Sequence, residues 1–94
     1  MKYRILSIAA SEIDEAMQFY EEKTSIGVGT AYFENAVSLI QSYPEAFVVV
    51  ESGFRRCLLR RFPYAVIYTI QNQELLIVSF MNLYKNPDSW KNRI

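Results

Sequence analysis

The order of apolar and polar positions changes in character midway along the chain. Residues 2–9 alternate as a strand does, and their largely apolar composition indicates a buried setting. Two segments with apolar residues at helical spacing follow, at 11–23 and 28–42. After residue 46 the chain is rich in β-branched and aromatic residues. The sequence therefore predicts one strand, then two helices, then a run of strands.

Local signals indicate where the two helices begin and end. Ser11 is a suitable N-cap residue, and the acidic residues that follow it suit the first turn of a helix. Residues 24–29 contain two glycines, so we expect a turn there that joins the helices as an antiparallel hairpin. Pro44 is expected to end the second helix.

Three strands are expected in the second half, at 54–62, 64–70 and 75–83. Gly53 and the polar residues 71–74 mark the turns, and Pro63 interrupts the ladder between the first two strands. We therefore predict a single α+β domain over residues 1–94, of order β-α-α-β-β-β. A helical hairpin packs on one face of a twisted, mainly antiparallel sheet of about four strands.

Composition excludes several function classes. The chain is 51% hydrophobic and 21% charged, as globular domains are, and no apolar run is long enough to span a membrane. It contains no histidine, and its one cysteine, Cys57, is expected to be a small buried residue. Histidine-based triads are therefore excluded, and we expect no metal and no organic cofactor. A cytoplasmic location is expected, because nothing resembles a signal peptide or a disulfide framework.

The net charge of zero hides an uneven distribution. Residues 1–52 hold three basic and eight acidic residues, a net charge of −5, while residues 53–94 hold seven basic and two acidic residues, a net charge of +5. This asymmetry either indicates an acidic partner for the second half, or the two halves neutralise each other within the fold.

The expected strand 54–62 carries four arginines. Arg56 and Arg60 share one face with Phe54, and Arg55 and Arg61 share the other. The helices can cover only one face, and an unpaired buried guanidinium is very costly. The arginines on the other face must therefore reach either water or an acidic partner.

Three stretches resemble the RelE/ParE superfamily of bacterial type II toxin–antitoxin toxins, which are often called plasmid stabilisation proteins. The first is "AASEIDEAMQFYEEKTSIGVGTAYFENAVSLIQSYP", which is similar to the helical opening of the family. The second, "GFRRCLLRRFPYAVIYTI", carries an arginine, a Phe-Pro-Tyr element and a further tyrosine. The third, "LLIVSFMNLYKNPDSWKNR", is similar to the family's basic ending with Pro87 and Trp90.

The resemblance implies a toxin that a cognate antitoxin neutralises. It also implies that the toxin forms either a dimer or a hetero-oligomer with the antitoxin. The chain is most similar to ParE-like members, which are associated with the poisoning of DNA gyrase through protein contact. The alternative is a RelE-like endoribonuclease that cuts mRNA on the ribosome. Many of those relatives carry an arginine where this chain has Ala65 and a histidine near Asn82. A non-toxic scaffold that only binds the antitoxin is a third alternative.

Each alternative has its own expected site. The expected partner-binding surface consists of Arg55, Arg56, Arg60, Arg61 and Arg93. In the ribonuclease alternative, Tyr84 assists proton transfer. The residues that would hold the phosphates there are Arg55, Arg61, Lys85 and Arg93.

Overall fold

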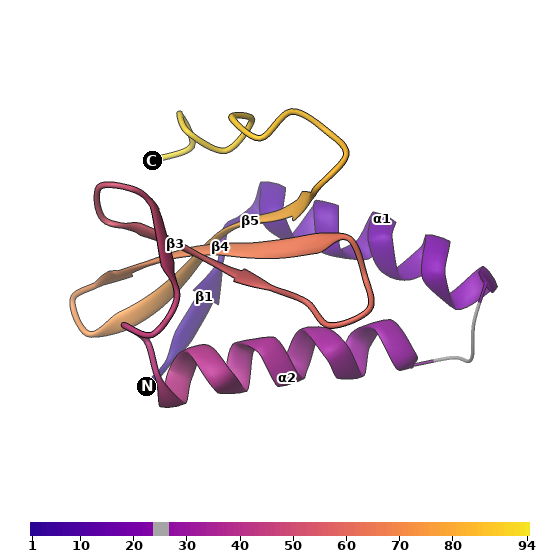
Figure 1. The fold of residues 1–94 in the computed structure, drawn as a ribbon, viewed down its shortest axis with the longest axis horizontal. Helices are drawn as coiled ribbons and strands as arrows, with labels where there is room; N and C mark the ends of the chain where they lie inside the picture. Colours follow the sequence, from indigo (N-terminus) through magenta and orange to yellow (C-terminus); the bar gives the residue numbers. More distant parts are fainter. Residues whose placement is uncertain (24–26) are drawn as a thin grey trace.

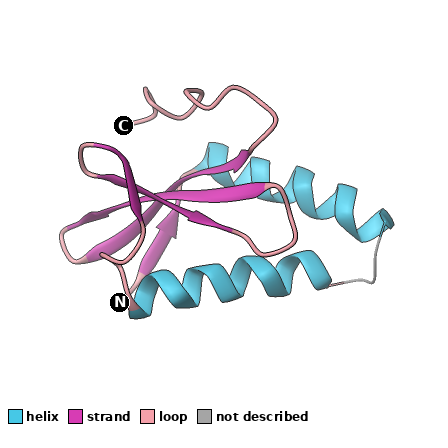
Figure 2. Cartoon of the chain, viewed as in Figure 1, coloured by secondary structure: helices cyan, strands magenta, loops and turns pink. Residues whose placement is uncertain are grey.

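The computed structural model describes residues 1–23 and 27–94. Within these described residues, two helices and five strands follow one another in the order β1, α1, α2, β2, β3, β4, β5 (Figures 1 and 2). Their bounds are β1 Tyr3–Ile5, α1 Ser7–Lys23, α2 Val28–Ser42, β2 Val48–Glu51, β3 Phe54–Leu58, β4 Tyr64–Gln71 and β5 Glu74–Asn82. The α+β class and the helical hairpin are confirmed.

All five strands form one sheet in the spatial order β1-β5-β4-β3-β2. β1 runs parallel to β5, and the other neighbours are antiparallel, so the sheet is mainly antiparallel as predicted. The expected number of about four strands is one too low. The β-branched run forms a strand of its own, in which Val48 pairs with Arg56 and Val49 with Arg55.

The first helix begins earlier than predicted. It starts at Ser7, directly after Leu6, whose N–H donates to the Ile77 carbonyl at 3.0 Å and ends the pairing of β1. Ser11 is therefore not the N-cap: it lies inside α1, where its hydroxyl donates to the Ser7 carbonyl at 3.3 Å. The acidic residues after it lie in the second and third turns, and the first turn holds none.

The second helix has the predicted bounds. Gly27, at φ 86°, stands at its start in the left-handed region that glycine tolerates, and α2 ends at Ser42, two residues before Pro44. The predicted turn at 24–29 falls partly on residues 24–26, which lie outside the described residues.

The strand predicted at 54–62 is too long, because β3 ends at Leu58. Residues 59–63 form a loop in which Arg61 has φ 69°. The expected assignment of Arg60 and Arg61 to opposite faces of a strand is therefore wrong. Pro63, which cannot donate to a ladder, lies in this loop just before β4.

The helical hairpin covers one face of the sheet, and together they form the larger apolar core. α1 and α2 contribute Ala16, Phe33 and Ile40, and the strands contribute Tyr68 and Phe80, among others. Cys57 is 2% exposed and belongs to this core, as expected.

The opposite face of the sheet is covered by the tail that follows β5, residues 83–94. In Figure 1 this tail runs above the sheet while α2 runs below it. Trp90 is only 3% exposed and packs with Ala65, Ile67 and Val78, and its ring lies 5.2 Å from that of Phe54. The tail has no regular helix or strand, yet it buries the second apolar face.

Candidate functional site

An open groove of about 760 Å³ lies between α1, the ends of β4 and β5, and the tail. Phe19 of α1 and Tyr84 of the tail are the most exposed aromatic side chains in its wall, at 54% and 86%. Glu15 and Lys85 also line it and are exposed. The groove thus offers aromatic surface with one exposed charge of each sign.

The Phe62-Pro63-Tyr64 segment fixes the backbone beside this groove. The Leu59 N–H donates to the Tyr64 carbonyl at 2.9 Å, and the Tyr64 N–H donates to the Phe62 carbonyl at 2.8 Å. The Pro63 carbonyl accepts from the Leu83 N–H at 2.8 Å. The loop before β4 and the start of the tail are therefore held together by the motif.

The side chains of the motif join an aromatic cluster. The Tyr20 ring lies edge-on to Phe62 at 4.5 Å and to Tyr64 at 5.8 Å, and the Tyr32 ring lies 5.2 Å from Phe62. Tyr64 stacks on Phe80, with ring centroids 4.7 Å apart and an interplanar angle of 12°. Such contacts stabilise one arrangement of the wall.

Tyr20 and Tyr64 of this cluster are poor general bases near neutral pH, because the pKa of each is raised. Burial, then the proximity of Tyr20, raises the pKa of Tyr64; Glu15 raises it further, and a hydrogen bond from the Asn82 amide opposes the shift. Burial, followed by Tyr84, also raises the pKa of Tyr20. A general base must lose its proton near neutral pH, and these shifts act in the opposite direction.

A partly buried ion pair closes the groove at the tail. The Arg93 Nη1 and Nη2 atoms donate to the two carboxylate oxygens of Glu12 at 2.7 and 3.0 Å, and Nη1 also donates to the Val78 carbonyl at 2.9 Å. Glu12 Oε1 further accepts from the Ser79 hydroxyl at 3.1 Å and the Phe80 N–H at 3.2 Å.

A bulge in β5 makes this arrangement feasible. Ile67 pairs with Ser79 and Tyr68 with Ile77, so Val78 is an extra residue on β5. A bulge leaves local backbone groups without a ladder partner. Here the Glu12 carboxylate accepts from the Phe80 N–H, and the Arg93 guanidinium donates to the Val78 carbonyl. These bonds join α1 and the tail to β5 at the bulge.

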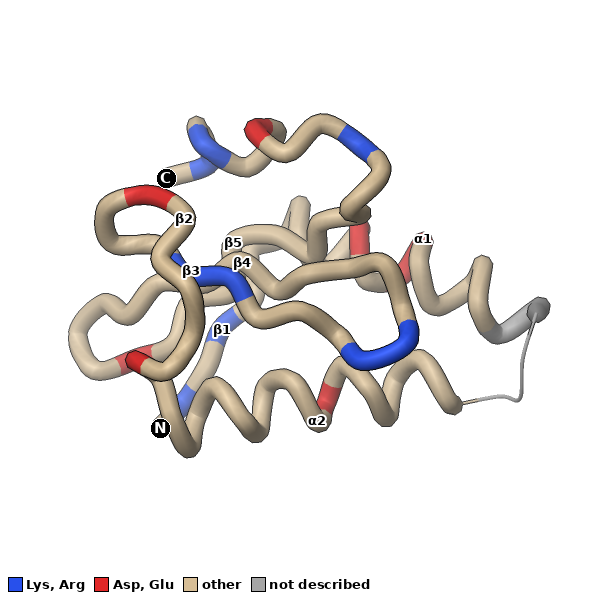
Figure 3. Tube along the Cα trace, in the orientation of Figure 1, with Lys and Arg blue, Asp and Glu red and all other residues tan. Residues whose placement is uncertain are grey.

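The five arginines of the expected partner-binding surface do not form one patch. The Arg93 side chain is 11% exposed and is paired with Glu12. Arg55 and Arg56 point to opposite faces of β3, whereas Arg60 and Arg61 are exposed in the loop after it. Figure 3 shows the blue loop segment beside α2, apart from the blue segment of β3.

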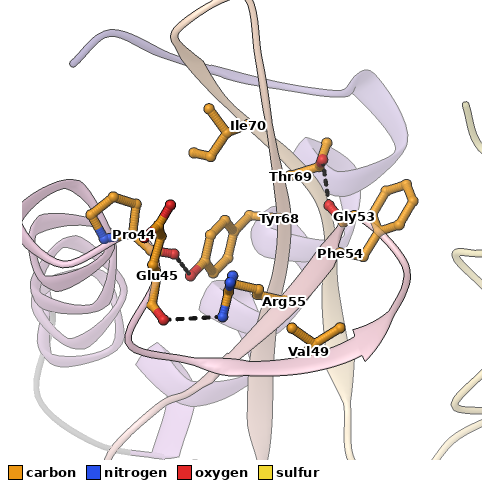
Figure 4. Close-up of a pocket in the computed structure, with 9 residues that line it drawn as sticks. All are labelled: Pro44, Glu45, Val49, Gly53, Phe54, Arg55, Tyr68, Thr69 and Ile70. Carbon is orange, nitrogen blue, oxygen red and sulfur yellow. Dashed lines mark hydrogen bonds between the residues drawn. The ribbon is translucent and has the colours of Figure 1, made fainter.

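Arg55 lines a smaller depression of about 220 Å³ at the other end of the sheet (Figure 4). Its Nη1 donates to the Phe47 carbonyl at 2.7 Å and the Glu45 carbonyl at 3.1 Å. The Tyr68 hydroxyl beside it donates to the Pro44 carbonyl at 2.7 Å. Arg55 therefore holds the connection between α2 and β2, and its guanidinium is already engaged.

The residues of the ribonuclease alternative are only partly brought together. Tyr84, Lys85 and Arg93 line the large groove. Arg55 lines the small depression instead, and Arg61 lines neither. Three of the five expected residues thus share one surface.

Sequence reasoning missed Glu12, Ser79 and Asn82. The sequence pattern predicts Glu12 in the first helical turn, whereas in the structure it accepts hydrogen bonds from the tail and from β5. Asn82 was noted only as the place of a missing histidine, yet its amide donates to the Tyr64 hydroxyl at 3.4 Å. Nothing in the sequence around Glu12 distinguishes it from the other acidic residues of that helix, and nothing around Arg93 signals that the two residues pair.

The charge asymmetry is partly balanced inside the fold. Glu12 of the acidic half pairs with Arg93 of the basic half. The pair of Arg4 and Glu74, at 3.2 Å, does not add to this balance, because each of the two carries the minority charge of its half. Among the described residues, no group of three or more acidic, cysteine or histidine side chains is placed to hold a metal ion. No helix in the described part of the chain has the length and apolarity needed to cross a membrane.

Comparison with known proteins adds a structural likeness. The sequence matches no protein-family model and no curated protein. The structure is similar to a chain of a chromosomal ParDE TA system from P. aeruginosa, with a TM-score of 0.65 and 15% sequence identity. The likeness covers 88% of this chain and 96% of that chain. At this identity the likeness establishes the fold, and this chain therefore has the ParE-like fold that its sequence resemblance predicts.

Proposed function

We propose that this chain is the toxin of a type II toxin–antitoxin pair, that a cognate antitoxin neutralises it, and that it inhibits growth by binding a protein target such as DNA gyrase. The observation that carries the proposal is the likeness to a chain of a ParDE TA system over nearly the whole length of both chains. The likeness covers 88% of this chain, and it agrees with the Phe62-Pro63-Tyr64 element found in the sequence.

The chemistry of the large groove supports binding rather than RNA cleavage. An endoribonuclease needs a group that exchanges a proton near neutral pH and cationic groups that face the phosphate. The chain has no imidazole, and burial raises the pKa of Tyr20 and Tyr64. Arg93 is neutralised by Glu12. An exposed aromatic wall suits the apolar contacts of a protein interface.

One observation favours the ribonuclease as a second candidate. Tyr84 is 86% exposed and lies in the same groove as Lys85, so a stacked base and a phosphate contact are sterically feasible there. In that mechanism, Lys85 would hold a phosphate. Tyr84 would either stack on the base or assist proton transfer.

Two assays with purified protein separate the candidates. Added protein is expected to inhibit supercoiling by DNA gyrase and to leave a reporter mRNA on translating ribosomes intact. Cleavage of that mRNA, lost in Lys85→Ala but kept in the matched control Lys2→Ala, would show that the chain is a ribonuclease instead. Inertness in both assays, with tight binding of a co-expressed antitoxin candidate, would indicate a scaffold that binds only the antitoxin.

A further inference from the structure

The outermost strand on one side of the sheet, β2, presents an apolar edge. The strand order places it at the end of the sheet, so its outer backbone groups pair with no strand among the described residues. Val48 and Val49 are 60% and 53% exposed. Sheet edges that avoid pairing usually carry charged residues, proline or a bulge. In β2 the charge of Glu51 and the bulge at Val50 lie at the end of the strand, so they leave the edge at Val48 and Val49 uncovered.

The structure holds this edge strand in place from both ends. Before it, Arg55 and Tyr68 donate to the carbonyls of Phe47 and Pro44. After it, the Thr69 hydroxyl donates to the Gly53 carbonyl at 2.6 Å. A strand that is already ordered loses little conformational entropy when another segment pairs with it.

One face of the edge has a depression for a side chain. Figure 4 shows Tyr68 and Arg55 between Val49 on one side and Ile70 on the other, with Pro44 nearby. Its volume of about 220 Å³ lies below the roughly 300–1,000 Å³ of small-molecule sites. Val49 and Ile70 are exposed, so the depression suits one apolar side chain of a larger partner.

The other face of the edge has an unused positive charge. Arg56 pairs with Val48, so both point to the face that the tail covers elsewhere. Within the described residues, the guanidinium of Arg56, a half-buried residue, forms no hydrogen bond and no ion pair. A residue on an added strand opposite Val48 would lie about 9.6 Å from Arg56, two strand spacings away. Long side chains can span that distance, and a carboxylate there would complement the arginine.

We propose that β2 accepts an extended segment of a partner protein as a sixth strand, and that this segment alternates apolar and acidic residues. Its apolar side chains face Val49 and the depression, and an acidic side chain faces Arg56. Backbone pairing supplies affinity in such complexes, and the side-chain sites supply specificity. The exposed Glu51 at the end of β2 disfavours an acidic residue opposite it, which sets the register. This inference holds whatever the cellular target is.

The test uses the full chain and a short, capped peptide of alternating valine and glutamate. Amide resonances of the isotope-labelled protein are followed by NMR during titration. Saturable shifts are expected at residues 48–51 and at Arg56, while the same peptide with lysine in place of glutamate is expected to bind at least about tenfold more weakly. Absence of shifts, or shifts confined to another surface, would overturn the proposal.

Matched variants test the role of the charge. Arg56→Glu is expected to weaken peptide binding at least about tenfold, whereas Lys2→Glu, with the same change of charge near β1 at the opposite edge, is expected to leave it unchanged. Should Arg56→Glu fail to fold, Arg56→Gln is expected to weaken binding in the same direction. Equal affinities of the Arg56 variant and the Lys2 variant would contradict the inference. So would a dimer of the unmodified chain, seen by sedimentation and abolished by Val49→Lys, because a second copy would then occupy the edge.

Discussion

The guanidinium of Arg93 and the carboxylate of Glu12, 81 positions apart in the chain, form a two-pronged ion pair with N–O distances of 2.7 and 3.0 Å. The pair does more than neutralise charge, because the same carboxylate also satisfies the hydroxyl and the amide of two residues at the β5 bulge. Removal of either partner would leave the charge of the other partly buried and without a counter-charge.

We therefore expect Glu12→Ala to destabilise the protein. The variant leaves Arg93 without a counter-charge and the Phe80 N–H without its acceptor, so the free energy of unfolding should fall by about 2–4 kcal/mol. Urea unfolding measures this change. The control is Glu74→Ala, which breaks the exposed pair with Arg4 and should cost less than about 1 kcal/mol. Equal losses in the two variants would contradict the assigned role of Glu12.

Trp90 is expected to be the main apolar anchor of the tail. It is 3% exposed, and Trp90→Phe or Trp90→Ala leaves a void over Ala65 and Ile67. The alanine variant should lose about 3–5 kcal/mol of stability in chemical unfolding followed by circular dichroism, and the phenylalanine variant should lose less. Tyr84→Ala, in the same tail but 86% exposed, should stay within about 0.5 kcal/mol of the unmodified protein. A stable Trp90→Ala protein would show that the tail contributes little.

Alkaline pH is expected to destabilise the protein as two buried groups ionise over overlapping pH ranges. Burial raises the pKa of Cys57 from 9.0 to about 11 and that of Tyr68 from 10.0 to about 12. Both groups therefore stay neutral up to a higher pH in the folded state than in the unfolded state. Their stabilising contribution is therefore complete below the unfolded pKa and is lost as pH rises through the folded pKa.

The measurement is the free energy of unfolding between pH 8 and the alkaline limit of refolding. Cys57→Ala should remove the part of the decline that begins near pH 9, and Tyr68→Phe the part that begins near pH 10. A Tyr84→Phe control should leave the profile unchanged, because that side chain is exposed. Identical profiles for all three variants would show that neither buried group is responsible.

Arg61 is expected to be held in an unfavourable backbone conformation. Its φ of 69° lies in the left-handed region, which costs an L-residue about 1–2 kcal/mol, while glycine enters it freely. Arg61→Gly should therefore be neutral or stabilising by up to about 1 kcal/mol, after the greater entropy of the unfolded glycine chain is included. Arg60→Gly, next to it and without a positive φ, should destabilise by about 0.5–1 kcal/mol. Thermal unfolding of both variants checks the difference, and a larger loss at residue 61 would refute it.

Local signals account for the elements that the sequence predicted well. The bounds of α2 follow from Gly27 and Pro44, which act within one or two residues of the helix ends. The start of α1 could not be read in this way, because it depends on where β1 stops pairing with Ile77, far along the chain. Ser11 has a side chain suited to an N-cap, but the helix starts at Ser7 because the pairing of β1 with β5 ends at Leu6.

The surface chemistry was harder to predict than the fold. The four arginines at 55, 56, 60 and 61 were assigned to strand faces by alternation, and alternation stops at Leu58. Arg55 donates to two loop carbonyls, a role that leaves no trace in local sequence. The pairing of Arg93 with Glu12 depends on a bulge in β5, and no pattern around Val78 marks it.

The parallel pairing of β1 with β5 has a consequence for synthesis on the ribosome. Tyr3 pairs with Leu75 and Ile5 with Ile77, so each pair is separated by 72 positions. At about 5–20 residues per second, the first strand waits roughly 4–14 s for its partner to be made. The nascent chain therefore cannot complete its sheet until β5 has been made. A product truncated before residue 74 would lack the strand that joins β1 to β4, and we expect it to be degraded rather than to act.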